Sequence, residues 1–166
     1  MDLTPQVTTG SATAAPALQT PVPASTARLR RASLGALFAL LVEYGLGMGV
    51  NLFVNVPDAD KGKGTGAAFG KAMSNGPAAL AAHAGIGILL ILNVIVVFVL
   101  ALRSRQRAAT VSSLVALLCV LGAAFSGAAF VDKGANGSSM TMAVLTGVAM
   151  ACYAVNLFVL GSDRKV

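Results

Sequence analysis

The sequence is poor in charged and aromatic residues. Only 11% of its 166 residues are charged, against about 25% in a typical soluble domain. It has no tryptophan, two tyrosines, two cysteines and one histidine. So few charges cannot cover the surface of a soluble protein of this size, and so few cysteines and histidines leave no clustered set of metal ligands. An ordinary soluble domain is therefore excluded, and no metal or other cofactor is expected.

The excess of basic residues does not indicate a nucleic-acid partner. Twelve Lys and Arg residues against six Asp and Glu residues give a net charge of +6. These basic residues lie in short connectors between apolar runs and are not interleaved with aromatic residues. A nucleic-acid-binding surface instead gathers its basic residues in a patch or along a helix. No nucleic acid is expected as a partner.

Four long apolar runs dominate the chain, at residues 32–54, 78–102, 108–131 and 138–161. The last three contain no Lys, Arg, Asp or Glu. Each run exceeds the roughly 20 residues that a helix needs to cross the hydrocarbon core, and an open sheet cannot satisfy its backbone in lipid. The sequence therefore predicts an all-α fold: an antiparallel bundle of four transmembrane helices over residues 32–161, in contact with the lipid bilayer.

Residues 1–31 are predicted to form a disordered cytoplasmic tail that ends in a basic anchor. The first 27 residues are rich in Ala, Thr and Pro, with Asp2 as the one charge, and such a segment buries too little apolar surface to fold. Arg28, Arg30 and Arg31 then precede the first apolar run. This run is longer than the roughly 7–15 apolar residues of a signal peptide, which indicates a membrane anchor that is not removed.

The basic residues predict the orientation in the membrane. Eight of them fall on the side of the two termini, and four fall on the other side. The positive-inside rule then places both termini, including the short tail 162–166, in the cytoplasm of a plasma-membrane protein. The eight are Arg28, Arg30, Arg31, Arg103, Arg105, Arg107, Arg164 and Lys165.

The external loop 55–77 contains a glycine-rich stretch, Lys61-Gly-Lys-Gly-Thr-Gly66, that suggests a phosphate loop. Such a loop requires Gly-Lys followed by Ser or Thr, whereas Gly70-Lys71 is followed by Ala72. The segment is therefore predicted to be a flexible external linker. A short helix on the membrane surface around residues 66–74 is the alternative.

Small residues recur four apart in every predicted span, as in Gly45/Gly49, Ala81/Gly85, Gly122/Ser126 and Ala143/Gly147. Because lipid gives no hydrophobic drive between helices, small residues allow the close approach on which packing depends. These steps predict a compact bundle. The same surfaces could serve a homo-oligomer or a larger membrane complex, and both remain open.

Glu43 is the single acidic residue within a predicted span. An ionisable residue at such depth is by default a functional-site hypothesis, whether as a carboxylate or as a neutral acid, since burial disfavours its charged form. Counting depth at about 1.5 Å per residue from the predicted cytoplasmic ends groups Glu43 with Asn93 and Tyr153, and Asn51 with His83 and Ser126. The candidate intramembrane polar site is Glu43, Asn51, His83, Asn93 and Tyr153.

These polar residues have two main interpretations. They could be interhelical hydrogen-bond pairs, worth roughly 0.6 kcal/mol each, or a site for a substrate, a proton or an ion. A haem would need Met48 or Met142 beside the single His83. Cys119 and Cys152 fall at a similar depth, where a redox pair is an alternative to two small buried hydrophobes.

Two resemblances follow from these segments. Four helices with one glutamate in the first resemble the small multidrug resistance transporters, which implies that Glu43 exchanges protons for cationic drugs. The long tail, the long external loop and the few aromatic residues depart from that pattern. The segments Glu43-Tyr-Gly-Leu-Gly-Met-Gly-Val-Asn-Leu-Phe-Val54 and His83-Ala-Gly-Ile-Gly-Ile-Leu-Leu-Ile-Leu-Asn93 also resemble uncharacterised four-helix membrane proteins of high-GC actinobacteria, which implies fold and location only.

The sequence thus predicts a structural or accessory membrane subunit without enzymatic activity, whose polar residues specify helix packing. The alternative is a small proton-coupled transporter or channel that uses Glu43 in the membrane interior, together with Asn51, His83 and Asn93.

Overall fold

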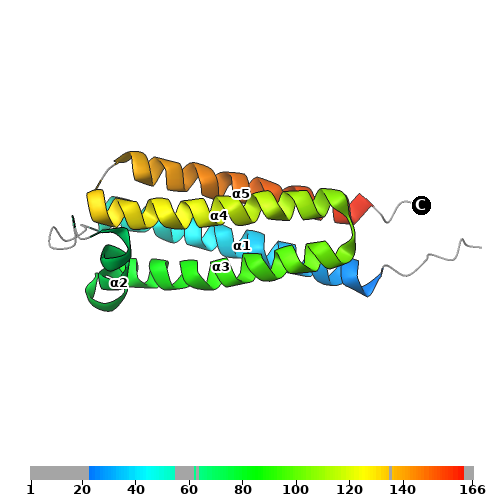
Figure 1. Ribbon diagram of the computed structural model, residues 1–166, viewed down its shortest axis with the longest axis horizontal. Helices are drawn as coiled ribbons and strands as arrows, with labels where there is room; N and C mark the ends of the chain where they lie inside the picture. The colour runs from blue at the N-terminus through cyan, green and yellow to red at the C-terminus, as the bar shows by residue number, and fades with distance from the viewer. Residues whose placement is uncertain (1–22, 55–61, 63, 135, 163–166) are drawn as a thin grey trace, which may run out of the picture.

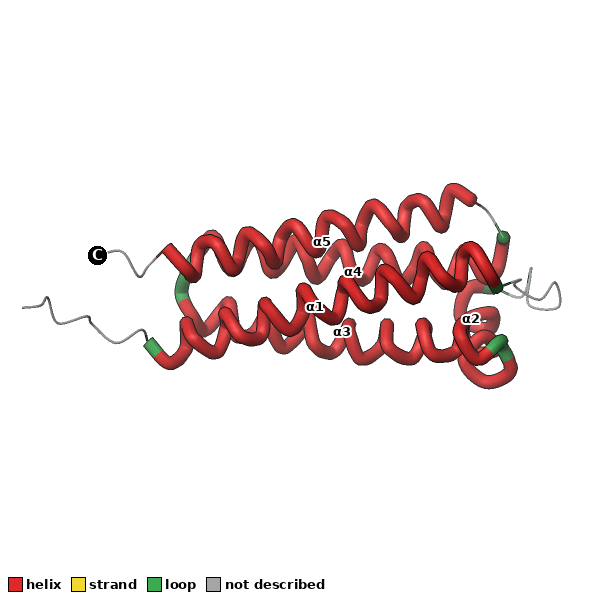
Figure 2. The backbone as a smooth tube through the Cα atoms, turned by 180° about the vertical axis from the view of Figure 1, so that it is seen from behind, coloured by secondary structure: helices red, strands yellow, loops and turns green. Residues whose placement is uncertain are grey.

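The computed structural model describes residues 23–54, 62, 64–134 and 136–162. Within these ranges four long helices run side by side, and a short helix covers one end of them (Figures 1 and 2). All four long helices are long and apolar enough to span a membrane, which confirms the predicted all-α multi-pass fold. The helices are α1 (Ala24–Phe53), α2 (Thr65–Asn75), α3 (Ala78–Ser104), α4 (Arg107–Lys133) and α5 (Asn136–Ser162).

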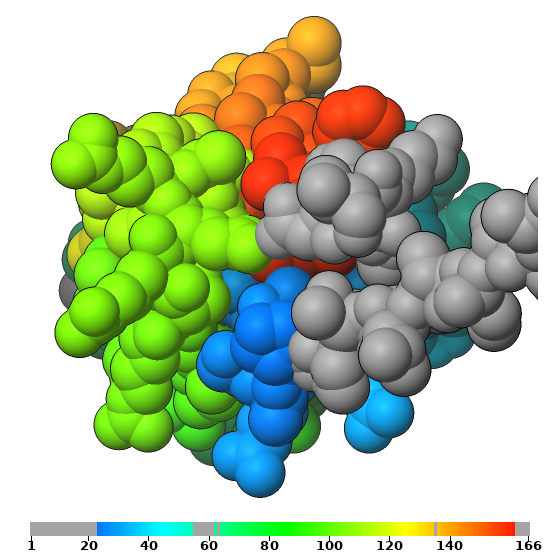
Figure 3. All heavy atoms as spheres, turned by 90° about the vertical axis from the view of Figure 1, so that its right-hand side faces the viewer, coloured from blue at the N-terminus to red at the C-terminus, as the bar shows by residue number. Residues whose placement is uncertain are grey.

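The four long helices form a ring in the order α1, α3, α4, α5. Helix α1 packs against α3 and α5, and α4 packs against the same two neighbours. The first turns of α1, the α3–α4 connection and the last turns of α5 share one end of the bundle, called here the terminal end (Figure 3). Helix α2 packs against α3 and α4 at the opposite end, called the α2 end.

Buried residues of α1 and α5 follow a strict heptad spacing. In α1 the intervals between them alternate between three and four residues, through Thr26, Leu29, Ser33, Ala36, Leu40, Glu43, Gly47 and Val50. The same alternation holds in α5, through Thr146, Ala149, Tyr153, Asn156 and Leu160. A mean period of 3.5 residues keeps one seam of each helix facing its neighbours, as in coiled coils and most four-helix bundles. Glu43 therefore occupies a core position of this seam.

Contacts between neighbouring helices fix their register, including a hydrogen bond from Asn156 to Ser113 that joins α5 to α4. Gly87 lies against Glu43, and Gly47 lies against His83. Asn51 accepts a hydrogen bond from Ser139. When each register is extended along the heptad positions, the core residues fall into layers. Each layer contains one residue from each long helix. One such layer is wholly aliphatic, and it consists of Leu40, Leu90, Val120 and Ala149, all buried.

Helix α1 begins at Ala24, eight residues before the predicted span, so the predicted disordered tail is wrong for residues 24–31. Ala, Leu and Arg are good helix formers, and Leu29 is fully buried in the same core cluster as Ala101, Ala109 and Leu160. These contacts explain why the basic segment joins the bundle. The rest of the predicted tail, residues 1–22, lies outside the described residues, as do residues 163–166 of the predicted C-terminal tail.

Helix α2 confirms that a short helix forms in the external loop, so the prediction of a flexible linker is wrong for Thr65–Asn75; its place on the membrane surface stays a prediction. Ala68 and Ala72 are buried in a small cluster with Val50, Leu80 and Val131. Because both side chains are buried, a larger side chain at either position would require α2 to move away from the bundle. Residues 55–61 and 63 of the predicted loop lie outside the described residues.

Asp132, near the end of α4, holds the start of α2 in place. Its backbone oxygen accepts a hydrogen bond from the amide of Gly62 at 3.0 Å. Its Oδ1 accepts one from the amide of Gly64 at 3.1 Å. Gly62 and Gly64 have φ angles of 74° and 87°, which residues with a side chain rarely adopt. Two glycines of the stretch that suggested a phosphate loop therefore shape a turn around Asp132.

Candidate functional site

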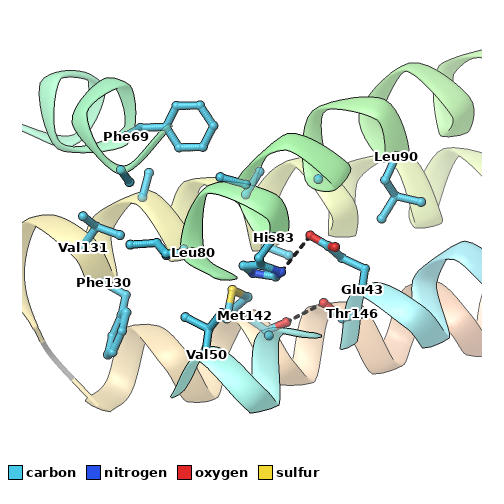
Figure 4. Close-up of a pocket in the computed structure, with 18 of the residues that line it drawn as sticks. Glu43, Val50, Phe69, Leu80, His83, Leu90, Phe130, Val131, Met142 and Thr146 are labelled. Carbon is cyan, nitrogen blue, oxygen red and sulfur yellow. Dashed lines mark hydrogen bonds and ion pairs between the residues drawn. The ribbon is translucent and has the colours of Figure 1, made fainter. Parts of the chain in front are cut away.

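Glu43 and His83 face each other across the α1–α3 interface (Figure 4). Oε1 of Glu43 lies 2.9 Å from Nδ1 of His83, and the two side chains are only 10% and 18% exposed. Depth counting had assigned these residues to different levels. Because α1 begins at Ala24 and α3 ends at Ser104, the two residues lie at nearly equal distances from the terminal end.

Two glycines make room for this pair. A Cβ atom added at Gly87 would lie 3.1 Å from Oε1 of Glu43, and one added at Gly47 would lie 3.0 Å from Cε1 of His83. Each ionisable side chain therefore rests on a glycine of the opposite helix. The two helices carry this arrangement in the same pattern, because Glu43-Tyr-Gly-Leu-Gly47 and His83-Ala-Gly-Ile-Gly87 both place an ionisable residue four positions before a glycine.

The pair has unused hydrogen-bonding capacity. Oε2 of Glu43 is buried and has no hydrogen-bond partner among the described residues. Nδ1 of His83 also lacks an aligned hydrogen bond in spite of its 2.9 Å approach to Oε1, so the contact is an ion-pair contact with poor hydrogen-bond geometry. A buried polar atom without a partner costs free energy. The pair is therefore not fully satisfied by the surrounding helices.

A cavity of about 120 Å³ lies beside the pair, on the side of α2. It is lined by residues of all five helices, including Phe69 of α2 and Met142 of α5 (Figure 4). The cavity forms because the core layers of Glu43 and His83 also contain small residues that leave space unfilled, such as Gly87, Ala123 and Gly127. A second recess of about 40 Å³ borders the same pair between α1 and α5.

The cavity ends at the aliphatic layer. Leu40, Leu90 and Val120 of this layer line it toward the terminal end. At the opposite end its lining includes Ala72 and Leu80, which belong to the cluster that fixes α2. The cavity therefore extends from the pair to the buried cluster beneath α2, and side chains of the aliphatic layer separate it from the terminal end.

Asn51 lines the same two cavities as the pair, whereas Tyr153 lies apart from it. Oδ1 of Asn51 accepts a hydrogen bond of 3.0 Å from Ser139 near the α2 end, and Asn51 borders both cavities. Tyr153 is fully buried on the terminal side of the aliphatic layer, and its hydroxyl has no partner among the described residues. The aliphatic layer thus separates Tyr153 from Glu43, with which it had been grouped.

Asn93 does not face the bundle interior, which corrects its predicted place beside Glu43. Leu90, Val94 and Val97 are the buried positions on this part of α3, whereas Asn93 is exposed. One residue along a helix turns the side chain by about 100°, so the position before Val94 points away from the core. Depth counting gives the level of a residue and not its direction.

A second polar group lies near the terminal end, and the sequence interpretation missed it as a group. Nδ2 of Asn156 donates a hydrogen bond of 2.9 Å to Oγ of Ser113, and both residues are fully buried. The registers place Ser33, also fully buried, in the same layer. The heptad phase with Ala149 and Tyr153 is the signal that could have assigned Asn156 to the core.

The two cysteines, which the sequence offered as a redox pair, form no disulfide bond. Cys119 and Cys152 are free thiols, each partly buried. Ser112 donates a hydrogen bond of 2.7 Å to the backbone oxygen of Cys152. Across the part of the chain that the structure describes, no group of three or more His, Cys, Asp or Glu residues could hold a metal ion.

Comparison with known proteins adds no family to this picture. No protein-family model matches the chain, and neither a curated protein nor a solved structure shows significant similarity to it. The resemblances to small multidrug resistance transporters and to actinobacterial four-helix proteins thus stay predictions. Four helices that can each span a membrane identify a multi-pass membrane protein.

Proposed function

We propose that this chain is a small proton-coupled transporter or channel in which Glu43 and His83 form the proton-binding site. One observation carries the proposal: Glu43, which is buried, lies 2.9 Å from the partly exposed His83, keeps a carboxylate oxygen without a partner among the described residues, and borders a cavity inside a membrane bundle. Ionisable groups within a membrane are costly and commonly mark proton or substrate pathways. A pair that served packing alone would be expected to satisfy its polar atoms.

The pair can hold different numbers of protons at different net charges. With one shared proton it is neutral overall, either as carboxylate and imidazolium or as carboxylic acid and imidazole. Adding or removing a proton leaves one uncompensated charge in a low-dielectric site, which is unfavourable. A cation or proton that enters the cavity therefore changes the favoured protonation state of Glu43 and His83. This exchange is the proposed basis of coupling.

The cavity supports access from the α2 end. Its lining extends to Ala72 and Leu80 there and stops at the aliphatic layer on the other side. In the proposed cycle, the pair exchanges protons with the α2 side in this conformation, and release toward the terminal end requires the aliphatic layer to open.

The test is proton movement in proteoliposomes that contain an entrapped pH-sensitive dye, driven by a potassium diffusion potential. Glu43→Gln removes the titrating group with little change in shape, and we expect it to abolish the protein-dependent proton flux. Thr141→Val is the matched control, because the hydroxyl of Thr141 donates to the backbone oxygen of Gly137 in its own helix and Thr141 lies outside the lining of both cavities. If wild-type protein moves no protons, or if Glu43→Gln changes only thermal stability, the proposal fails.

A structural or accessory subunit is the second candidate. It is supported by the polar residues that join helices: Asn156 with Ser113, Ser139 with Asn51 and Ser112 with the backbone of Cys152. Such bonds specify packing and need no transported ligand. Co-purification from membranes distinguishes this candidate, since an accessory subunit is recovered in a fixed ratio with other proteins.

A plasma-membrane location with both termini in the cytoplasm completes the proposal. Among the described residues, six arginines lie at the terminal end: Arg28, Arg30, Arg31, Arg103, Arg105 and Arg107. Lys71, Lys133 and Asp132 lie at the α2 end. The positive-inside rule favours the arginine-rich end as the cytoplasmic one.

A further inference from the structure

Asn93 is a polar residue on the outer surface of the membrane bundle. It is exposed and makes no hydrogen bond with any described residue. It lies fifteen residues after the start of α3 at Ala78 and eleven before its end at Ser104, and hence well inside the span. Lipid offers no partner for an amide at this depth, which makes its exposure there costly.

Asn93 belongs to a second heptad stripe of α3. Positions three and four residues apart form this outer stripe, which consists of Ile86, Leu89, Asn93, Val96 and Leu100. It lies one residue out of phase with the buried seam of Leu90, Val94 and Val97. Leu89 is 65% exposed and Val96 is 55% exposed, so Asn93 is flanked by apolar side chains that the bundle does not cover.

We propose that the outer stripe is the dimer interface of this protein, with a second copy of the chain as its partner. Two copies in one membrane share the same orientation, and a two-fold axis along the membrane normal makes their α3 helices parallel. The axis then brings Asn93 to Asn93 of the partner subunit at equal depth. Each amide can donate and accept one hydrogen bond, so the contact is self-complementary, as a two-fold interface requires.

The position of the amide favours this occupant over a different protein. A single Asn at a core position of an apolar heptad stripe specifies register and oligomeric state in coiled coils. A different membrane protein would need an independently placed polar group at the same depth, whereas a second copy supplies it by symmetry. This inference does not rest on the proposed proton-coupled function, because the outer stripe lies outside the cavity lining.

The test is the dimer dissociation constant in liposomes, measured by photobleaching of singly labelled protein over a range of protein-to-lipid ratios. We expect wild type to dimerise and Asn93→Leu to weaken the dimer about tenfold, which corresponds to about 1.4 kcal/mol. Asn93→Gln keeps an amide and should restore most of the affinity. Leu118→Ala, at a 59% exposed position of α4, is the control and should change the constant less than twofold.

A second measurement locates the interface. In a background with Cys119 and Cys152 replaced by Ala, Leu89→Cys and Val96→Cys should cross-link between copies, whereas Leu118→Cys should not. A wild-type protein that stays monomeric at all densities overturns the inference, as does a dimer that Asn93→Leu leaves unchanged. Cross-linking through position 118 alone, or a fixed complex with a different protein on the outer stripe, also overturns it.

Discussion

At the scale of single residues, glycine decides whether the two ionisable side chains can meet. Gly87→Ala would place a Cβ atom 3.1 Å from Oε1 of Glu43, which requires the carboxylate or the α1–α3 spacing to shift. We expect this variant to lower the free energy of unfolding in detergent by about 1–3 kcal/mol, the usual cost of overpacking. The measurement is reversible denaturant unfolding followed by circular dichroism.

Gly45→Ala is the matched control, since nothing lies within 4 Å of a Cβ at this position of α1. It should leave stability unchanged or raise it by up to about 1 kcal/mol, because Ala favours helix more than Gly. Equal losses in the two variants would show that helix flexibility, and not the space beside Glu43, is the reason for glycine.

Substitution of the two buried serines of one core layer by alanine should affect stability differently. Ser113 accepts a hydrogen bond from Asn156, so Ser113→Ala leaves a buried amide donor unpaired and should cost about 0.5–2 kcal/mol. Ser33 is equally buried, but its hydroxyl has no partner among the described residues. Ser33→Ala should therefore be neutral or slightly stabilising. A loss of similar size in both variants, by thermal unfolding in the same detergent, would contradict this assignment.

The sequence identified Glu43 as the exceptional residue of the membrane domain but could not identify its partner. In a soluble helix, the polar face reveals which residues point inward. Helix α3 is apolar all round because its outer face meets lipid. Its sequence therefore does not show that Val94 faces the core and Asn93 does not. Without that phase, Asn93 was assigned to the interior and His83 to a separate layer.

At the scale of helices, α2 depends on alanine at two positions. Ala68 is fully buried, whereas its neighbour Ala67 is exposed. We expect Ala68→Leu to displace α2 from α3 and α4 while the four long helices stay intact, because the larger side chain cannot fit without a shift of the backbone. Hydrogen exchange of residues 65–75 should rise about tenfold or more.

Ala67→Leu adds the same side chain one residue away and should leave that exchange rate within about twofold. If hydrogen exchange of residues 65–75 is equally fast in both variants, the burial of Ala68 is not what holds α2 to the bundle. If Ala68→Leu also raises exchange throughout α3, the helix is an integral part of the bundle and not a separate cover.

The helices themselves were largely predictable, because the length of an uninterrupted apolar run reports the thickness of the bilayer. Their ends were not. The predicted tail ended at the basic residues Arg28, Arg30 and Arg31. Leu29, which lies between the first two, is nevertheless fully buried in the bundle. Arginine is a good helix former, and its long side chain can extend from the bundle into the interface. Composition therefore did not reveal that the helix begins before the first apolar run.

At the scale of the whole molecule, the orientation can be measured directly. In a background with Cys119 and Cys152 replaced by Ala, Gly66→Cys places a thiol at the α2 end and Ala108→Cys places one at the terminal end. Both positions are exposed. A membrane-impermeant maleimide should label position 66 in intact cells and position 108 only after lysis, because the arginine-rich end faces the cytoplasm. The opposite pattern would invert the proposed direction of access to the cavity.

The strict heptad spacing of the core also limits how the length of this protein can change. One residue inserted into a long helix would turn everything beyond it by about 100°, moving Glu43 or His83 out of the core. Insertions of seven residues preserve the phase and add about 10.5 Å, but all four long helices would have to lengthen together. Homologous chains in thicker or thinner bilayers should therefore keep the same number of core layers and adjust through helix tilt.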